Sequence, residues 1–327
     1  MANRKDAKDW AREHMKGLWT SPMYPFTQDF KLDEQGIRNN VEYMLKVKST
    51  GLGFGFSEPW VCSHEERIRA FEVATDAVRK RVPAYVHTTD HSVEETINYT
   101  KRAMAIGADA VMIWAPYEWA KSQEMLIEYY EYVASKVDIA IFVYNTYHSG
   151  IGMTPETVAR LAKIPNVCAL KDAVNDVTHT VRCIDLCGDQ IVISEPLEDH
   201  LLTMTLNFKQ QIMLGTTSVF LMQTPDYQPI QEYWDLARQG KAAEASRKYY
   251  ELQPLRDVWN GIYEVLWDKT GATHPLPYIK YWMELMGMNA GPVRPPMKNL
   301  TEAQKTAFRA RLEASGWMDR LLPNRKK

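Results

Sequence analysis

The chain has 327 residues, 45% of them hydrophobic, and a formal net charge of −2. Such a chain can bury one large core and carry a smaller addition, and its near-neutral charge excludes a strongly basic surface for nucleic acid. No segment reaches the roughly 18 consecutive apolar residues of a membrane span. The charged amino terminus lacks the apolar stretch of a signal peptide, and the four cysteines fit a reducing compartment. We therefore expect a cytoplasmic protein with no nucleic-acid or membrane partner.

Strands and helices alternate through the first two thirds of the sequence. After a short amphipathic lead-in, apolar runs predict eight strands, each followed by a helix, at 17–22, 51–57, 82–88, 108–114, 139–144, 167–170, 191–194 and 211–217. Capping-box spacings at 63–66 and 92–95 mark the start of two of these helices. Thr154 followed by Pro155 marks a third start, because the backbone of proline is pre-set for the first helical position.

Eight strand and helix units at this spacing predict a (β/α)8 TIM barrel at residues 1–228, with its active site at the carboxyl ends of the strands. The alternative is an open doubly wound sheet. It fits less well because no glycine-rich phosphate motif follows the first strand, and the glycines of 51–55 lie within a strand at the wrong spacing. From residue 229 the pattern is helical only, which predicts a C-terminal helical appendage at 229–327. Its expected helices are 230–239, 242–263, 276–286 and 301–315.

A lysine occurs where the pattern predicts dry surroundings. Lys171 directly follows the apolar strand 167–170, and Tyr144 ends the strand before it. A buried lysine needs a partner or a task. An amine in an apolar site loses proton affinity and can form a Schiff base with a ketone, and a neighbouring phenol can move protons. We therefore predict Lys171 and Tyr144 as a catalytic pair. The alternative is a strand-end lysine paired with Asp172.

The segments around these two residues resemble a known family. The strings are Tyr-Asn-Thr at 144–146, Thr-Pro-Glu-Thr-Val-Ala-Arg-Leu-Ala at 154–162 and Ala-Leu-Lys-Asp-Ala at 169–173. They resemble the Schiff-base core of the dihydrodipicolinate synthase and N-acetylneuraminate lyase family. Weaker matches lie at 17–26, 63–66, 107–109, 116–117 and 291–296. The resemblance implies a covalent imine through Lys171 with no other cofactor and no metal. It also implies a homo-oligomer, with a tetramer favoured.

Three substrate-facing positions differ from the family pattern. Where the family has Gly-Thr-Thr-Gly-Glu, with both threonines holding the carboxylate of a 2-oxo acid, residues 54–58 read Phe-Gly-Phe-Ser-Glu. Glu118 replaces a tyrosine that the synthases lend to a neighbouring subunit. His148 and Ser149 stand where an arginine grips the second substrate's carboxylate. The resemblance thus implies retained imine chemistry on a different substrate.

The expected function follows from these differences and from aromatic residues near the predicted mouth of the barrel. Those residues are Phe54, Phe56, Trp60, Trp114, Trp119 and Tyr147. We expect a Schiff-base-dependent lyase, an aldolase or hydratase-aldolase, that acts on a 2-oxo acid with a bulky or aromatic substituent in carbon catabolism. The predicted substrate-binding residues are Gly55, Phe56, Ser57, Glu118, His148 and Thr217.

Two other functions remain open. A hydratase or hydrolase on the same barrel would need no imine and would activate water with Glu118 or Glu58. A non-catalytic binding protein is the least consistent, because Lys171 and Tyr144 would have no need to coexist.

Other polar residues at strand ends have competing interpretations. His87, His91 and Glu58 have the chemistry of a metal site. We favour hydrogen bonding in the loops, because a Schiff-base lysine makes a metal electron sink redundant. Cys183 and Cys187, one helical turn apart, would need further ligands. Glu58 takes the family's structural glutamate position, whereas Glu195 is left open as a general base, an ion-pair partner or a subunit contact.

Overall fold

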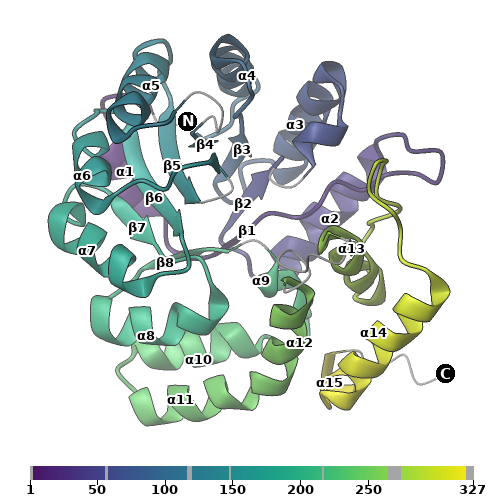
Figure 1. Ribbon diagram of the computed structural model, residues 1–327. Helices are drawn as coiled ribbons and strands as arrows, with labels where there is room; N and C mark the ends of the chain where they lie inside the picture. The colour runs from purple at the N-terminus through teal and green to yellow at the C-terminus, as the bar shows by residue number, and fades with distance from the viewer. Residues whose placement is uncertain are drawn as a thin grey trace.

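A computed structural model describes residues 3–55, 58–115, 120–146, 149–215, 217–263 and 274–321. Eight parallel strands form one sheet in the order β7-β6-β5-β4-β3-β2-β1-β8 (Figure 1). They are β1 (Gly17–Thr20), β2 (Gly51–Phe54), β3 (Ala84–His87), β4 (Ala110–Trp114), β5 (Ala140–Thr146), β6 (Val167–Ala173), β7 (Val192–Ser194) and β8 (Ile212–Leu214). The order follows the chain and brings the first strand beside the last. The predicted TIM barrel is therefore confirmed, and the open doubly wound alternative is wrong.

The remaining seam, between β7 and β8, is bridged by a side chain. The Ser194 hydroxyl accepts a hydrogen bond of 2.9 Å from the Leu214 amide and lies 3.3 Å from the Ile212 carbonyl, to which it donates. A serine at the last position of β7 thus joins two strands that share no backbone pairing in the sheet. The result is a nearly closed barrel.

Helices follow the strands around the outside of the barrel. They are α2 (Glu34–Lys46), α3 (His64–Val78), α4 (Val93–Ala105), α5 (Gln123–Ser135), α6 (Pro155–Leu161), α7 (Val177–Cys187) and α8 (Glu198–Phe208). The predicted caps are present, with one difference. Ser63 and Glu66 form a full capping box. Ser92 caps α4 with its hydroxyl, but its own amide donates to Asp90 instead.

The inside of the barrel is a packed apolar core, as a TIM barrel requires. Its buried residues include Trp19, Tyr85, Met112, Phe142 and Tyr144. The first helix, α1 (Ala7–His14), joins this cluster through Ala7 and Ala11, which are fully buried. The amphipathic segment before the first strand is therefore a helix that covers the amino end of the barrel. A separate, larger apolar layer lies between the strands and the surrounding helices.

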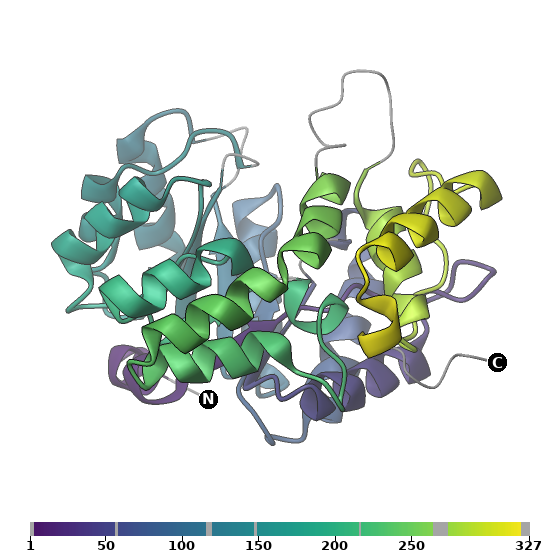
Figure 2. The same ribbon diagram turned by 90° about the horizontal axis from the view of Figure 1, so that it is seen from below.

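The C-terminal helices pack on one side of the barrel (Figure 1). They are α9 (Ser218–Leu221), α10 (Pro229–Arg238), α11 (Ala242–Glu251), α12 (Gln253–Tyr263), α13 (Leu276–Leu285), α14 (Glu302–Ala314) and α15 (Met318–Leu321). Figures 1 and 2 both place α10 and α11 beside α8, and α14 beside α12 and α13. A helical appendage on the barrel is therefore present. Its division from the barrel at residue 228 remains a prediction.

One predicted helix is two. The sequence pattern ran through 242–263, but α11 ends at Glu251 and α12 begins at Gln253. Pro254 supplies the reason, since a proline has no amide hydrogen and its ring clashes with the carbonyl one turn earlier. Every helix in the described ranges is too short or too polar to cross a membrane.

Candidate active site

Lys171 and Tyr144 lie side by side at the carboxyl end of the barrel. They are direct partners in the ladder between β5 and β6. The Lys171 ammonium nitrogen is 4.9 Å from the centre of the Tyr144 ring, and both residues are buried. Residues that are partners in a parallel ladder lie side by side on neighbouring strands. The pairing of β5 with β6 therefore brings together the two residues that the sequence places at separate strand ends.

The surroundings of Lys171 favour the free amine. Burial lowers the pKa of Lys171 to about 7, and the negative charge of Glu195 opposes this shift. A large share of the amine is therefore unprotonated near neutral pH. An unprotonated, desolvated amine is the form that attacks a carbonyl carbon.

Tyr144 stays a neutral phenol over the same pH range. Burial raises its pKa far above the usual value, while a hydrogen bond with the Thr146 side chain acts in the opposite direction. Ionisation of Tyr263 would raise the pKa of Tyr144 further. Such a phenol can donate a proton and take it back, as a group for proton transfer beside an imine must.

An aromatic wall runs from Tyr144 towards the surface. Trp114, the last residue of β4, stacks on Tyr144 with ring centres 5.7 Å apart. Trp60, in the short helix η1 (Pro59–Val61), stacks on Trp114 at 5.9 Å, and His91 lies 4.9 Å from Trp60. Trp60 is 42% exposed, so the outer end of the wall meets solvent. Stacked aromatic faces of this kind offer a surface to a flat substrate.

The metal site considered from the sequence is not assembled. His87 is buried edge-on against Trp114, and burial, Arg67 and Lys171 lower its pKa to about 3. Glu58 is engaged elsewhere, with its carboxylate 2.9 Å from the Lys280 ammonium nitrogen and accepting from the Tyr24 amide. Burial raises the pKa of Glu58, and the charge of Lys280 opposes that shift. These contacts give Glu58 a structural place between barrel and appendage.

Among the described residues, one other group brings together the ligand types of a metal: Asp172, His179 and Cys183. It lies between β6 and α7. The Asp172 carboxylate accepts from Asn145 at 2.9 Å and from Thr180 at 2.7 Å, and lies 2.9 Å from Nδ1 of His179. The other ring nitrogen of His179 donates to the Met153 carbonyl at 2.7 Å. Hydrogen bonds already satisfy these side chains, so we describe the group as structural. Asp172 thus has partners other than Lys171.

Two of the predicted substrate-binding residues lie in the described part of the chain. Gly55 follows β2 with a φ of +84°, and a Cβ there would lie 2.8 Å from Phe71 and 2.9 Å from the Tyr24 hydroxyl. The position therefore requires glycine. Thr217, beyond β8, accepts a hydrogen bond of 2.8 Å from Trp259, and its hydroxyl is 3.1 Å from that of Tyr263. The other four predicted residues lie outside the described ranges: Phe56, Ser57, Glu118 and His148.

Three further side chains of this region are Trp259, Tyr263 and His200: the sequence assigns the two aromatic residues mainly to the core or to subunit contacts, with a pocket wall as the alternative, and does not single out His200. The first two come from α12 and meet Thr217, as described above. His200, in α8, lies 3.2 Å from the buried carboxylate of Glu195. Each contact arises from helices that pack back on the barrel, and no local motif marks it.

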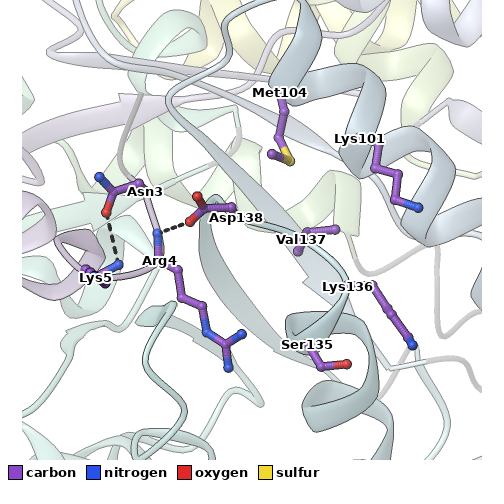
Figure 3. A pocket seen from close by; sticks show the side chains of 9 residues that line it. All are labelled: Asn3, Arg4, Lys5, Lys101, Met104, Ser135, Lys136, Val137 and Asp138. Atoms are coloured by element: carbon purple, nitrogen blue, oxygen red, sulfur yellow. Dashed lines mark hydrogen bonds between the residues drawn. The ribbon is translucent and has the colours of Figure 1, made fainter.

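A separate hollow of about 620 Å³ lies at the opposite end of the barrel (Figure 3). The amino-terminal segment borders it, where the Arg4 amide donates to Asp138 at 2.5 Å, just before β5 begins. Lys101 and Met104 of α4 line another side. The hollow is far along the strands from Lys171, so it forms no part of this site.

Comparisons with known proteins agree with the fold. Residues 14–315 match the Dihydrodipicolinate synthetase family. The 4-hydroxy-tetrahydrodipicolinate synthase of Syntrophus aciditrophicus is 32% identical over 92% of this chain and 98% of its own length. That of Methanothrix thermoacetophila is 30% identical over 90% of this chain and 95% of its own length. A prophage protein of the dihydrodipicolinic acid synthase family from E. coli K12, solved in complex with pyruvate, has a TM-score of 0.79 at 26% identity, over 92% of this chain and 98% of that one. The chain belongs to the dihydrodipicolinate synthetase family and is a lyase of the Schiff-base aldolase type.

Proposed function

We propose that this lyase forms its imine at Lys171, with Tyr144 as the group that transfers protons, and that its substrate is a 2-oxo acid with a bulky or aromatic substituent. The observation that carries the proposal is the buried amine of Lys171, whose pKa lies near 7, beside a neutral phenol. A buried amine that can lose its proton at neutral pH is a nucleophile ready for a ketone.

The reaction then runs through a covalent cycle. The Lys171 nitrogen attacks the keto carbon, and the carbinolamine loses water to give a cationic imine. That imine accepts the electron pair when the bond between C3 and C4 of a 4-hydroxy-2-oxo acid breaks, while the C4 hydroxyl gives up its proton and an aldehyde leaves. Protonation of the resulting enamine gives the imine of the product 2-oxo acid, and hydrolysis of that imine consumes one water and releases the 2-oxo acid and the free amine. Tyr144 is the side chain next to Lys171 that can carry protons in these steps.

The aromatic wall supports the substrate class. Tyr144, Trp114 and Trp60 present a continuous stack from the amine to solvent. An aryl group laid along it would gain about 25 cal/mol for each Å² of apolar surface removed from water. Phe56 also stands at the position of a family threonine, so a small 2-oxo acid loses a hydrogen bond that costs about 1.5 to 3 kcal/mol when the partner is charged. Pyruvate alone should therefore bind poorly.

Without the family's threonine pair, other groups must bind the carboxylate of the substrate. Thr217 accepts from Trp259, and it can give its own hydrogen to a ligand only when Tyr263 donates to it. Ser57 and backbone amides near Gly55 are the other groups that we propose. In the same way we propose a role in carbon catabolism in the cytoplasm and a homo-oligomer, with a tetramer favoured by the family.

The test is reductive trapping. Incubation with pyruvate or with an aryl 2-oxo acid, reduction with borohydride and peptide mapping should place the added mass on Lys171, with more label from the aryl compound. Lys280 is the internal control, because it too is buried with a lowered pKa but contacts Glu58 and three carbonyls. Label on Lys280 or another lysine would refute the site, and equal label from both compounds would refute the substrate class.

A hydratase that works without an imine is the competing function. Glu58 is a weak choice for its base, because Lys280 and the Tyr24 amide already occupy the carboxylate. The Lys171→Ala variant separates the two mechanisms, tested on a substrate found by screening. An imine-dependent lyase should lose its turnover in this variant, whereas a hydratase that works without an imine should keep it.

A further inference from the structure

Arg67 is a buried cation beside the outer end of the aromatic wall. It lies on α3, and its side chain is only 3% exposed, although arginine is seldom buried without partners. One terminal nitrogen of the guanidinium donates to the Asp90 carboxylate at 2.8 Å, and the other donates to the Thr89 carbonyl at 2.9 Å. The remaining nitrogen, Nε, is buried and has no hydrogen-bond partner among the described residues. The covalent cycle at Lys171 does not use this charge.

The Arg67 guanidinium lies over two aromatic rings. Its central carbon is 4.0 Å from the centre of the Tyr99 ring, on α4, and 5.7 Å from the centre of the Trp60 ring. A guanidinium within about 6 Å of a ring centre is attracted to the face of that ring. Arg67 therefore contacts directly the tryptophan that forms the exposed end of the wall.

Arg67 also fixes the segment after β3, which meets the wall at two further points. The Thr89 hydroxyl accepts a hydrogen bond of 2.9 Å from the Trp114 amide. Two residues on, the ring of His91 lies 4.9 Å from that of Trp60. The bonds that the arginine makes to this segment thus reach both tryptophans.

An exposed tryptophan needs such support. Trp60 is carried by η1, a helix of three residues, and its ring stacks on Trp114 with the two planes 17° apart. Holding an exposed side chain in one orientation costs conformational entropy, which contacts on the covered part of the ring must offset. Trp114, His91 and Arg67 supply contacts of this kind.

We propose that Arg67 is a positioning residue that keeps Trp60 stacked on Trp114, and that it thereby sets the affinity of the site for a flat aryl group. The inference rests on the proposed function, because it assigns the aryl substituent of the substrate to this stack. Arg67 acts through Trp60 and not on the substrate itself. The Asp90 carboxylate already pairs with its charge, so Arg67 contributes through the position of the ring rather than through attraction of an anion.

The test compares Arg67→Met with wild type in two measurements. Near-ultraviolet circular dichroism reports the orientation of Trp60, as the difference between each protein and the same protein carrying Trp60→Phe. Calorimetric titration with 3-phenylpropanoate, an aryl acid that has no keto group, reports affinity for the wall. Arg67→Met should diminish the Trp60 signal and weaken binding by about two- to tenfold, the factor that one stacked aromatic pair contributes. In a Trp60→Ala background the same substitution should weaken binding by a smaller factor, because its main target is absent.

Arg69→Met is the matched control. Arg69 lies on the same helix, but its guanidinium binds the carboxylates of Glu34 and Glu72 instead. This variant should keep both the Trp60 signal and the wild-type affinity.

Arg67→Lys is the second variant. A lysine keeps the charge, but its compact ammonium lacks the fork that binds Asp90 and the Thr89 carbonyl together. It should therefore change both measurements in the same direction as Arg67→Met, by less. If Arg67→Met does not fold by far-ultraviolet circular dichroism, Arg67→Lys decides, and wild-type values for that variant overturn the inference.

The outcomes separate this inference from the proposed imine, because neither measurement uses a keto group. An unchanged Trp60 signal in Arg67→Met overturns the inference whether or not Lys171 is trapped with a 2-oxo acid. An equal loss of affinity with and without Trp60 also overturns it, since the arginine would then act elsewhere. Absence of binding to wild type refutes the wall as an aryl site and the inference with it.

Discussion

Two lysines in this chain are buried to the same extent, yet their surroundings differ. Lys171 and Lys280 are each 2% exposed, and burial lowers the pKa of both. Lys280 contacts the Glu58 carboxylate at 2.9 Å and the Tyr24 carbonyl at 2.8 Å, which hold a cation in place. Lys171 lies over the ring of Tyr144. Burial is thus shared by the two amines, whereas the groups named beside them differ.

Tyr144 can be tested apart from Lys171. Tyr144→Phe should still form the imine, because the amine and its dry site remain. Turnover should fall by roughly 100-fold or more, as expected when an acid-base group is lost. Borohydride trapping and steady-state rates measure the two effects separately. Tyr130→Phe is the matched control. Tyr130 of α5 is also buried, but its hydroxyl donates to the carbonyl of Ile113 in β4. A Tyr144→Phe enzyme as fast as Tyr130→Phe would exclude Tyr144 from proton transfer.

At this scale the sequence predicted the pair but not the contacts that helices add at the same end of the barrel. Lys171 was visible because a charge directly follows an apolar strand, and Tyr144 because it ends the strand before. Glu195 could be noted as a strand-end carboxylate, but its contact with His200 depends on how α8 folds back on β7. Lys280 gave no local signal, because its burial comes from the packing of α13 against residues near position 24.

At the scale of elements, polar residues explain where prediction and structure differ. The sequence pattern ended two strands at Tyr144 and Leu170, whereas β5 reaches Thr146 and β6 reaches Ala173. Asn145 and Asp172 continue the ladder as partners, and their side chains are joined by a hydrogen bond of 2.9 Å. Buried polar groups with satisfied hydrogen bonds are tolerated in a strand. An apolar pattern cannot show this, because it depends on a partner 27 positions away.

The network between β6 and α7 predicts a pH-dependent stability. Asp172 raises the pKa of His179 above its usual 6.5. A raised pKa in the folded state adds stability below pH 6.5, and that stability is lost as the pH rises through the higher folded value. Urea midpoints of wild type and His179→Asn should therefore differ more at pH 5.5 than at pH 9. A constant difference across this range would mean that the charge of His179 contributes nothing.

At the scale of the whole molecule, buried ion pairs fasten the appendage to the barrel. Arg256 of α12 bonds the Glu198 carboxylate of α8 at 2.6 and 3.0 Å, and both side chains are 1% exposed. Lys280 of α13 contacts Glu58 in the same manner. The helix that carries Arg256 also carries Trp259 and Tyr263, which meet Thr217 beyond β8. The appendage thus contributes side chains to the carboxyl end of the barrel.

The pair of Arg256 and Glu198 allows a test of whether charge or packing holds α12. Arg256→Met leaves the Glu198 carboxylate buried without its cation, and loss of one partner of a buried pair costs about 3 to 5 kcal/mol. The double variant Arg256→Met with Glu198→Gln leaves no charge unpaired, and Tyr233, which donates to Glu198 at 2.7 Å, keeps an acceptor. Its stability, measured by urea unfolding, should recover much of the loss. Equal losses in the single and double variants would show that the stem of Arg256 acts by packing alone. Below the unfolding transition both variants should still be trapped at Lys171, because the ladder of β5 and β6 is unchanged.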